Sequence, residues 1–139
     1  MVSIKRILVV DDEPGIRALL SDVLSGPERH VTLASDGLEA VRRLRERRYD
    51  AVVTDVNMPG MNGIDLLRWM KKNKRREKTV VMSGSSRHDL LPARGLPPVR
   101  ARFRKPFRIP AFVKTMEEVL ADRKRGTGRR LAAGRKGTA

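Results

Sequence analysis

The segment KRILVVDDEP, residues 5–14, carries the clearest structural signal in this chain. Its apolar residues 7–10 stop abruptly at three acidic residues, 11–13. A short apolar run of this kind is typical of a strand that is buried on both faces of a parallel sheet. Pro14 suits the first turn of a helix, where its missing N–H costs nothing. The stretch therefore predicts a strand, an acidic loop and a helix.

The same order recurs along the chain. Further strands are predicted at 30–34, 50–56, 79–82 and 100–105, with amphipathic helices between them and a last helix beginning near Pro110. Strands alternating with helices imply βαβ units and a mostly parallel sheet covered on both faces. The residues predicted to face the sheet are Ile16, Leu19, Leu20, Val23 and Leu24, then Leu38, Val41 and Leu44, then Ile64, Leu67 and Met70, and finally Phe112, Val113, Met116, Val119 and Leu120.

Two regions depart from this regularity. Proline and glycine at positions 92, 95, 97 and 98 interrupt the place of the fourth helix, which we expect to be short or broken. Residues 126–139 are rich in glycine, arginine and alanine with little to bury, so we expect disorder there. The prediction is one domain over 1–121 and a basic tail over 122–139.

Composition excludes several classes of protein. The 139 residues suit one domain, and the absence of cysteine excludes disulfides and thiolate metal sites. No apolar stretch approaches the roughly 20 residues that span a bilayer, and no secretory leader is recognisable. We therefore expect a cytoplasmic protein with no membrane insertion.

The net charge of +15 is high, and it is spread over the chain. The tail over 122–139 holds seven basic residues and one acidic residue, which leaves 24 basic and 15 acidic residues, a net charge of +9, in the rest. Such a field favours polyanionic partners such as nucleic acid or anionic lipid. A solubilising surface is the plainer interpretation, because no aromatic residues are interleaved for base stacking.

Chemically useful side chains follow the predicted strands. Asp11 and Asp12 follow the first strand, Asp55 the third and Ser83 the fourth, and strand ends of parallel sheets are where functional groups gather. Three converging carboxylates repel one another unless a cation binds, and an oxygen-only site suits Mg²⁺ or Mn²⁺. Lys105 supplies a fixed cation, and its bond to Pro106 is a candidate cis peptide. Taken singly, each residue also fits an ordinary capping or turn role.

Together these residues resemble the bacterial response-regulator receiver family over about residues 3–121. The resemblance rests on four groups of residues, namely Asp11-Asp12-Glu13, Asp55 with Met58, Pro59 and Gly63, Ser83, and Lys105-Pro106-Phe107. It implies a flavodoxin-like (βα)5 fold, a doubly wound parallel five-stranded sheet in the order 2-1-3-4-5.

The resemblance also implies roles for individual residues. Asp55 corresponds to the phosphoacceptor, with Lys105 and Ser83 contacting the phosphoryl oxygens and Ser83 shifting inward. The implied metal ligands are Asp12, Asp55, the backbone carbonyl of Asn57 and, through water, Asp11. Asn57 and Ser85 occupy the positions that tune autodephosphorylation.

One residue departs from the family pattern. Receivers usually place Tyr or Phe three residues before the lysine, where this chain has Arg102. An always-charged guanidinium enters an apolar slot only at high cost, and Phe103 should point to the opposite face of its strand. We therefore expect output through a remodelled or mobile surface around Arg102 and residues 86–99; the alternative is a shortened helix of no consequence.

These features predict a single-domain response regulator, because no output domain is recognisable after residue 121. It would receive its phosphoryl group from a sensor histidine kinase or phosphotransfer protein, docking around Ile16, Arg17 and Leu20, and would signal to a downstream protein without being an enzyme in any wider sense. The alternative is a receiver-derived module that binds nucleic acid or another polyanion through its basic helices and tail. A haloacid-dehalogenase-type phosphohydrolase ranks last, because Asn57 stands where that chemistry needs a second aspartate.

Overall fold

Strand β1 (Lys5–Val10) is the apolar run predicted from the sequence, and its residues 7–10 have no exposed surface. The structure, a computed structural model, describes residues 3–84 and 97–122. The other strands are β2 (Arg29–Ala34), β3 (Ala51–Asp55), β4 (Lys78–Ser83) and β5 (Val99–Arg104). The helices of the described residues are α1 (Pro14–Leu24), α2 (Gly37–Glu46), α3 (Gly63–Lys72) and α4 (Ile109–Ala121).

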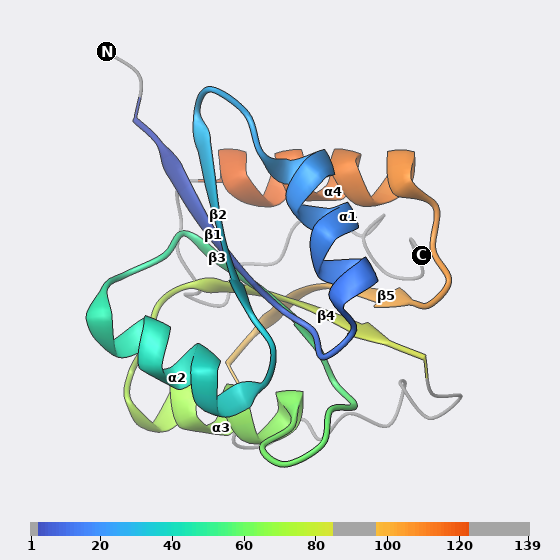
Figure 1. Cartoon of the computed structure of the whole chain (residues 1–139). Coiled ribbons are helices and arrows are strands. Elements are labelled where there is room, and N and C mark those ends of the chain that lie inside the picture. The colour runs from blue at the N-terminus through green and yellow to red at the C-terminus, as the bar shows by residue number, and fades with distance from the viewer. Residues whose placement is uncertain (1–2, 85–96, 123–139) are drawn as a thin grey trace.

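All neighbouring strands pair in parallel, in the order β2-β1-β3-β4-β5 (Figure 1). The predicted flavodoxin-like sheet is therefore confirmed, and each strand bound differs from the prediction by at most one residue. The segment predicted to hold a short or broken fourth helix lies mostly outside the described residues, as does the tail from residue 123. Within residues 3–84 and 97–122, no helix combines the length and apolar character of a bilayer span.

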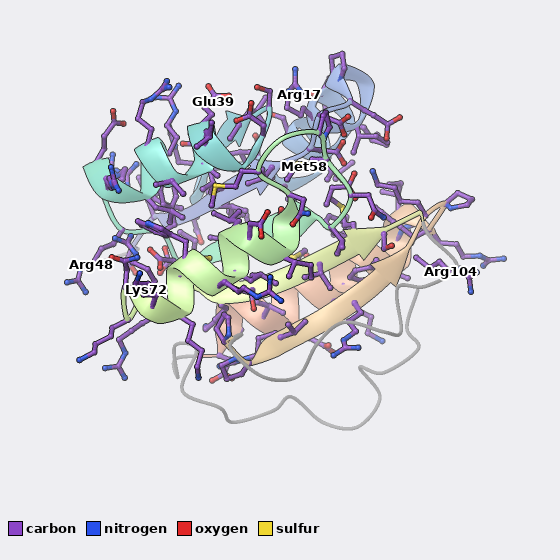
Figure 2. The ribbon with its side chains drawn as sticks, turned by 90° about the horizontal axis from the view of Figure 1, so that it is seen from below. Arg17, Glu39, Arg48, Met58, Lys72 and Arg104 are labelled. Atoms are coloured by element: carbon purple, nitrogen blue, oxygen red, sulfur yellow. The ribbon has the colours of Figure 1, made fainter. Side chains whose placement is uncertain are left out.

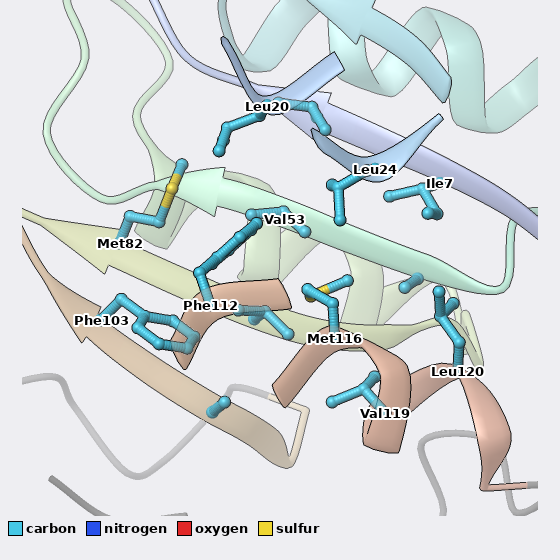
Figure 3. Packing of buried hydrophobic residues seen from close by; sticks show 14 residues of the cluster. Ile7, Leu20, Leu24, Val53, Met82, Phe103, Phe112, Met116, Val119 and Leu120 are labelled. Atoms are coloured by element: carbon cyan, nitrogen blue, oxygen red, sulfur yellow. The ribbon is translucent and has the colours of Figure 1, made fainter. Parts of the chain in front are cut away.

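Two apolar cores lie on opposite faces of the sheet. Helices α1 and α4 pack against one face, and α2 and α3 against the other (Figure 1). The first core joins Ile7 and Val53 of the sheet to Leu20 and Leu24 of α1 and to Phe112 of α4 (Figure 3). Burial of these aliphatic and aromatic side chains fixes the helices over the sheet, so the strand ends hold a defined geometry.

Two residues predicted to face the sheet are exposed instead. The exposed fraction is 41% for Leu19 and 65% for Leu38. Each precedes or follows the buried stripe of its helix by one residue, which places it about 100° around the axis. In α2 the stripe contains Ala40 and Leu44, which are fully buried. The hydrophobic pattern therefore predicts the helices correctly, but the buried face that it predicts for each helix is wider than the observed one.

Charged side chains are buried at the edge of the sheet where the strands begin. Lys78 Nζ donates to the carbonyl oxygen of Val119, 2.8 Å away in the last turn of α4. Arg100 Nη1 lies 2.7 Å from Asp122 Oδ2, at the end of the same helix. Burial lowers the pKa of Lys78. A cation beside the terminal carbonyls of a helix is favourable, so these contacts anchor α4.

Gly63 limits how closely α3 approaches the end of β3. Its N–H donates to the Val56 carbonyl oxygen at 3.1 Å, and a Cβ there would collide with the Asp55 carbonyl oxygen and lie 2.9 Å from Val56 Cα. We expect Gly63→Ala to lower the free energy of unfolding by about 1–3 kcal/mol, because the obstructing atoms are backbone. Urea denaturation measures this.

Gly15→Ala is the matched control, since a Cβ at Gly15 has no heavy atom within 4 Å. Alanine in a helix should leave stability unchanged or raise it by up to about 1 kcal/mol. Equal effects of the two substitutions would contradict the assigned close contact.

Candidate functional site

Three carboxylates converge where β1 and β3 end. Asp11 and Asp12 follow β1, and Asp55 is the last residue of β3, its parallel neighbour in the sheet. One carboxylate oxygen from each of the three lies within 4.8 Å of the others. Asp11 and Asp55 are buried, whereas Asp12 is exposed. The sheet thus brings together the acidic trio that the sequence predicts.

Lys105 joins this cluster from the loop after β5. Its Nζ lies 2.8 Å from Asp11 Oδ2 and 3.0 Å from Asp55 Oδ2, and 3.2 Å from Glu13 Oε1. Its backbone N–H donates to the Ser83 carbonyl oxygen at 2.8 Å, which extends the pairing of β5 with β4. The Lys105–Pro106 peptide is cis, as predicted.

An aromatic cluster holds the loop that carries Lys105. The ring of Phe107 stacks on Phe112 with centroids 5.1 Å apart and meets Phe103 edge to face at 5.4 Å. Phe103 and Phe112 are fully buried and lie 5.2 Å apart. Offset and edge-to-face contacts of this kind add to the stability gained by burial. The backbone on both sides of Lys105 is therefore tied to the core.

Polar groups of β3 and β4 complete the site. The backbone N–H of Asn57 donates to Asp55 Oδ1 at 3.1 Å. The Asn57 side-chain amide donates to Ser83 Oγ at 3.4 Å, a long hydrogen bond, and Ser83 is buried. Both residues lie where the sequence places them, so the structure gathers Asp55, Lys105, Asn57 and Ser83 around one point.

Two residues that contact the acidic cluster, Glu13 and Arg17, were not predicted from the sequence as residues of the site. The Glu13 carboxylate pairs with Lys105, and its N–H donates to Asp11 Oδ1 at 2.9 Å. Arg17 Nη1 donates to the Asp11 carbonyl oxygen at 2.7 Å from the first turns of α1. Glu13 is signalled by its place in the acidic loop. Arg17 has no such signal, because its contact depends on how α1 sits over β1.

Burial and neighbouring charges shift the pKa values of Asp55 and Lys105 in opposite directions. Burial raises the pKa of Asp55, and the hydrogen bond from Lys105 reduces that shift without cancelling it. Burial alone would lower the pKa of Lys105, but its hydrogen bonds to Asp11 and Asp55 outweigh this effect and raise the pKa. The lysine therefore stays charged at neutral pH, and it offsets part of the carboxylate repulsion.

The donor set favours a hard divalent cation beside a nucleophile. Carboxylate and carbonyl oxygens suit Mg²⁺ or Mn²⁺, and the exposed Asp12 leaves one side of the cluster open to solvent. A carboxylate held beside a fixed ammonium group can act as a nucleophile toward an electrophile that carries negative charge. The geometry thus fits metal-assisted group transfer onto Asp55.

Residues 7–117 match the family model of the response regulator receiver domain. The chain belongs to this family. Receiver domains act in phosphorylation-based two-component signalling, where they interact with histidine kinases or phosphotransfer proteins and with downstream targets. The resemblance drawn from the sequence is therefore confirmed.

Relatives of the receiver match it over different shares of their length. Sporulation initiation phosphotransferase F of Bacillus subtilis is 32% identical over 116 residues, which cover 84% of this chain and 94% of that protein. The DNA-binding response regulator MtrA of Mycolicibacterium smegmatis is 43% identical over 67 residues, 48% of this chain and only 29% of that protein. The chain thus resembles nearly the whole of one relative and a minor part of the other.

A solved structure shares the fold. The response regulator TrrA of Thermotoga maritima, in complex with Mg²⁺ and BeF, superposes with a TM-score of 0.73 at 28% identity, covering 84% of this chain and 99% of that chain. The similarity extends over most of the receiver, so the arrangement of strands and helices around Asp55 is that of a known receiver.

Arg102 is the residue at which we expect a departure from the family pattern. Arg102 is exposed on β5, while Phe103 points into the core and is fully buried. These opposite orientations follow from the alternation of side chains along a strand. Ser85, predicted to tune the phosphoryl lifetime, lies outside the described residues, as does most of the 86–99 segment.

The prediction that Leu20 helps to dock a partner is wrong. Leu20 is fully buried in the first core, so it cannot contact another protein. Ile16 and Arg17 are half-buried, and Leu19 offers the exposed apolar surface of α1. Leu19 and Leu38 were misplaced for the same reason, because sequence spacing alone does not fix which side of a helix meets the sheet.

Lys105→Met should destabilise the receiver at pH 7.5. Asp11 and Asp55 would stay buried without their cation, and we expect a loss of about 1–3 kcal/mol in the free energy of unfolding, measured by urea denaturation with a chelator present. Because the folded-state pKa of Lys105 is raised, its contribution is complete at neutral pH and is lost only as the pH rises through that pKa.

Glu13→Gln is the control, because the Glu13 side chain is 61% exposed and its pairing with Lys105 is solvent-screened. We expect a change below about 0.5 kcal/mol. A loss of unfolding free energy as large as that of Lys105→Met would show that the pairs of Lys105 with the buried Asp11 and Asp55 are not what stabilises the site.

Proposed function

We propose that this receiver accepts a phosphoryl group on Asp55 and signals by phosphorylation-dependent binding to a downstream protein. The donor would be a histidine kinase or phosphotransfer protein. The observation that carries the proposal is the contact of Lys105 Nζ with both Asp11 and Asp55. This contact places a fixed positive charge beside the nucleophile, where the oxygens of a phosphoryl group need it.

The proposed metal ligands are oxygen atoms of residues already gathered at the site. Asp12, Asp55 and the backbone carbonyl of Asn57 would bind Mg²⁺ or Mn²⁺ directly, and Asp11 would do so through water. The convergence of three carboxylates supports this assignment. When bound, the cation would neutralise the carboxylates and the phosphoryl oxygens.

The transfer step needs little covalent chemistry from the protein. A carboxylate oxygen of Asp55 forms a bond to phosphorus as the bond from phosphorus to the donor's imidazole nitrogen breaks, and the electron pair of that bond stays on the nitrogen. Lys105 would move its hydrogen bonds from the carboxylates to the incoming oxygens. Ser83 Oγ would donate to one of them, replacing its contact with Asn57.

Switching and output would differ from the usual pattern. Ser83 would shift toward the phosphoryl group, while Arg102 keeps its charged end in solvent. Asn57 and Ser85 would set the lifetime of the phosphoryl group. The proposed signalling unit is residues 1–121, acting in the cytoplasm as a binding module whose catalysis is confined to its own phosphorylation and slow autodephosphorylation.

Phosphorylation is testable by intact-mass spectrometry after incubation with acetyl phosphate and MgCl₂. We expect a gain of about 80 Da, the mass of one phosphoryl group, that is lost in Asp55→Asn and in chelator. Asp65→Asn is the control, since Asp65 is a partly exposed carboxylate in the first turn of α3 that does not belong to the acidic trio, and it should keep the full gain. Modification that persists in Asp55→Asn would reject Asp55 as the acceptor.

Metal binding is testable separately from phosphorylation. We expect MgCl₂ to raise the melting temperature of the wild type with increasing concentration, because a ligand of the folded state stabilises it by mass action. Asp12→Asn should abolish the rise without lowering stability in chelator, since Asp12 is exposed. Glu13→Gln, which removes a neighbouring carboxylate outside the acidic trio, should preserve it. Loss of the rise in both variants would argue against the proposed ligand set.

A further inference from the structure

Positive charge gathers where α2 and α3 end. The exposed lysines and arginines of residues 42–48 and 68–76, four in the first segment and five in the second, form what we call the basic surface. Glu46 is the only acidic residue in these two segments. Figure 2 shows Arg48 and Lys72, one from each segment, at the same end of the two helices.

The basic surface lies at the opposite edge of the sheet from the phosphorylation site. Strands and helices alternate in direction, so the ends of α2 and α3 lie where the strands begin, whereas Asp55 lies where β3 ends. Figure 2 shows this separation, with Arg48 and Lys72 at one end of the molecule and Arg17 and Met58 toward the other. A ligand of the basic surface therefore need not contact the acidic site.

Hydrogen bonds fix the two segments relative to each other. Arg75 Nη2 donates to the Arg47 carbonyl oxygen at 3.0 Å and to Glu77 Oε2 at 2.6 Å. Glu77 is buried, and its Oε2 also accepts the N–H of Tyr49 at 3.0 Å. The surface is therefore preorganised, which lowers the entropic cost of binding. A depression between the segments is lined by Arg48, Asn73, Lys74, Arg75, Arg76 and Glu77.

The ends of α2 and α3 carry far more positive charge than is needed to offset the partial negative charge of two helix C-termini. A helix C-terminus is equivalent to about half a negative elementary charge, so two helix ends account for about one cation. Among the nine exposed cations, the described contacts include one ion pair, between Arg68 and Asp65 at 3.7 Å. Crowded like charges repel one another and destabilise the folded state. A polyanionic ligand would relieve that repulsion.

Lys74 gives a second, independent indication. Its φ of 55° is left-handed, and the N–H groups of Lys74 and Arg75 donate to the carbonyls of Lys71 and Met70, which is a Schellman motif at the end of α3. Glycine is the usual residue there, because it has no Cβ to be crowded. The backbone therefore disfavours lysine at this position, which points to a role for its side chain.

We propose that the basic surface binds the phosphodiester backbone of a nucleic acid duplex. A duplex presents closely spaced negative charges along a line, which matches cations supplied by two neighbouring helix ends. Trp69 lies among the cations of the second segment, so the expectation of no interleaved aromatic residue is wrong there. Base stacking is still not expected, because Arg45 covers the Trp69 ring at 5.8 Å from its centroid. Binding would therefore depend on the backbone and not on base sequence.

The apolar residues argue against a membrane as the ligand. Surface binding to lipid uses exposed large hydrophobic side chains beside the cations. The exposed large hydrophobics of the described residues are Ile4, Leu19 and Leu38, and none belongs to the two segments. The inference goes beyond the proposed function and does not depend on it.

The test is fluorescence anisotropy of the 139-residue chain with a labelled mixed-sequence DNA duplex of about 20 base pairs over a series of KCl concentrations. The test variant is Lys71→Gln, Lys72→Gln and Lys74→Gly combined. The control variant is Arg104→Gln, Arg108→Gln and Lys114→Gln, which removes three exposed charges from other surfaces. Net charge is therefore matched, and both variants keep the basic tail.

We expect the test variant to bind the duplex at least about tenfold more weakly than the wild type at roughly 0.1 M salt. The slope of log affinity against log salt concentration should flatten by about 2–3, because each lost phosphate contact removes about 0.9 from the slope. The control variant should change the slope by less than about one. Lys74→Gly alone should weaken binding while keeping or raising the melting temperature, since glycine suits the left-handed backbone. This single variant separates lost binding from lost folding.

The proposal is overturned if the wild type does not bind the duplex, or if the test and control variants bind it equally weakly. It is also overturned if the wild type binds vesicles containing phosphatidylserine and not the duplex, and only the test variant loses that binding. Acetyl phosphate labelling of the test variant reports on Asp55 separately. We expect it to be unchanged, so failure of this inference and failure of the proposed function are distinguishable.

Discussion

The contact of Lys105 with two buried carboxylates is the interaction on which the site depends. Two like charges about 4 Å apart repel by about 4 kcal/mol at an effective dielectric constant near 20. The parallel pairing of β1 with β3 forces Asp11 and Asp55 into this situation. Lys105 relieves it from a loop two strands away from β3 in the sheet.

The aromatic cluster explains how Lys105 is held there. Phe103 precedes it on β5 and Phe107 follows it, and both rings pack with Phe112 of α4. Phe103 is fully buried in this cluster, so its ring is a structural part of the core. Arg102 is exposed, and the buried ring of Phe103 is the one aromatic ring on β5.

Charge divides the described part of the molecule into two ends. Acidic side chains gather where the strands end, and basic side chains gather where α2 and α3 end. The alternation of strand and helix directions produces this separation, because a helix that crosses back over the sheet ends at the edge where the next strand begins. A net charge of +15 can therefore coexist with a locally acidic site that binds a cation.

The order of the elements, the parallel sheet and the residues of the acidic site could all be predicted from the sequence. These follow from local signals, since apolar runs end at Asp11 and Asp55, and helices begin at Pro14 and near Gly63. Tertiary structure alone decided which side of each helix is buried, as Leu19, Leu20 and Leu38 show. It also decided the contact of Arg17 with Asp11 and the joining of the two basic segments by Arg75. Such contacts depend on the angle and height at which a helix sits on the sheet, and packing sets these quantities over the whole core.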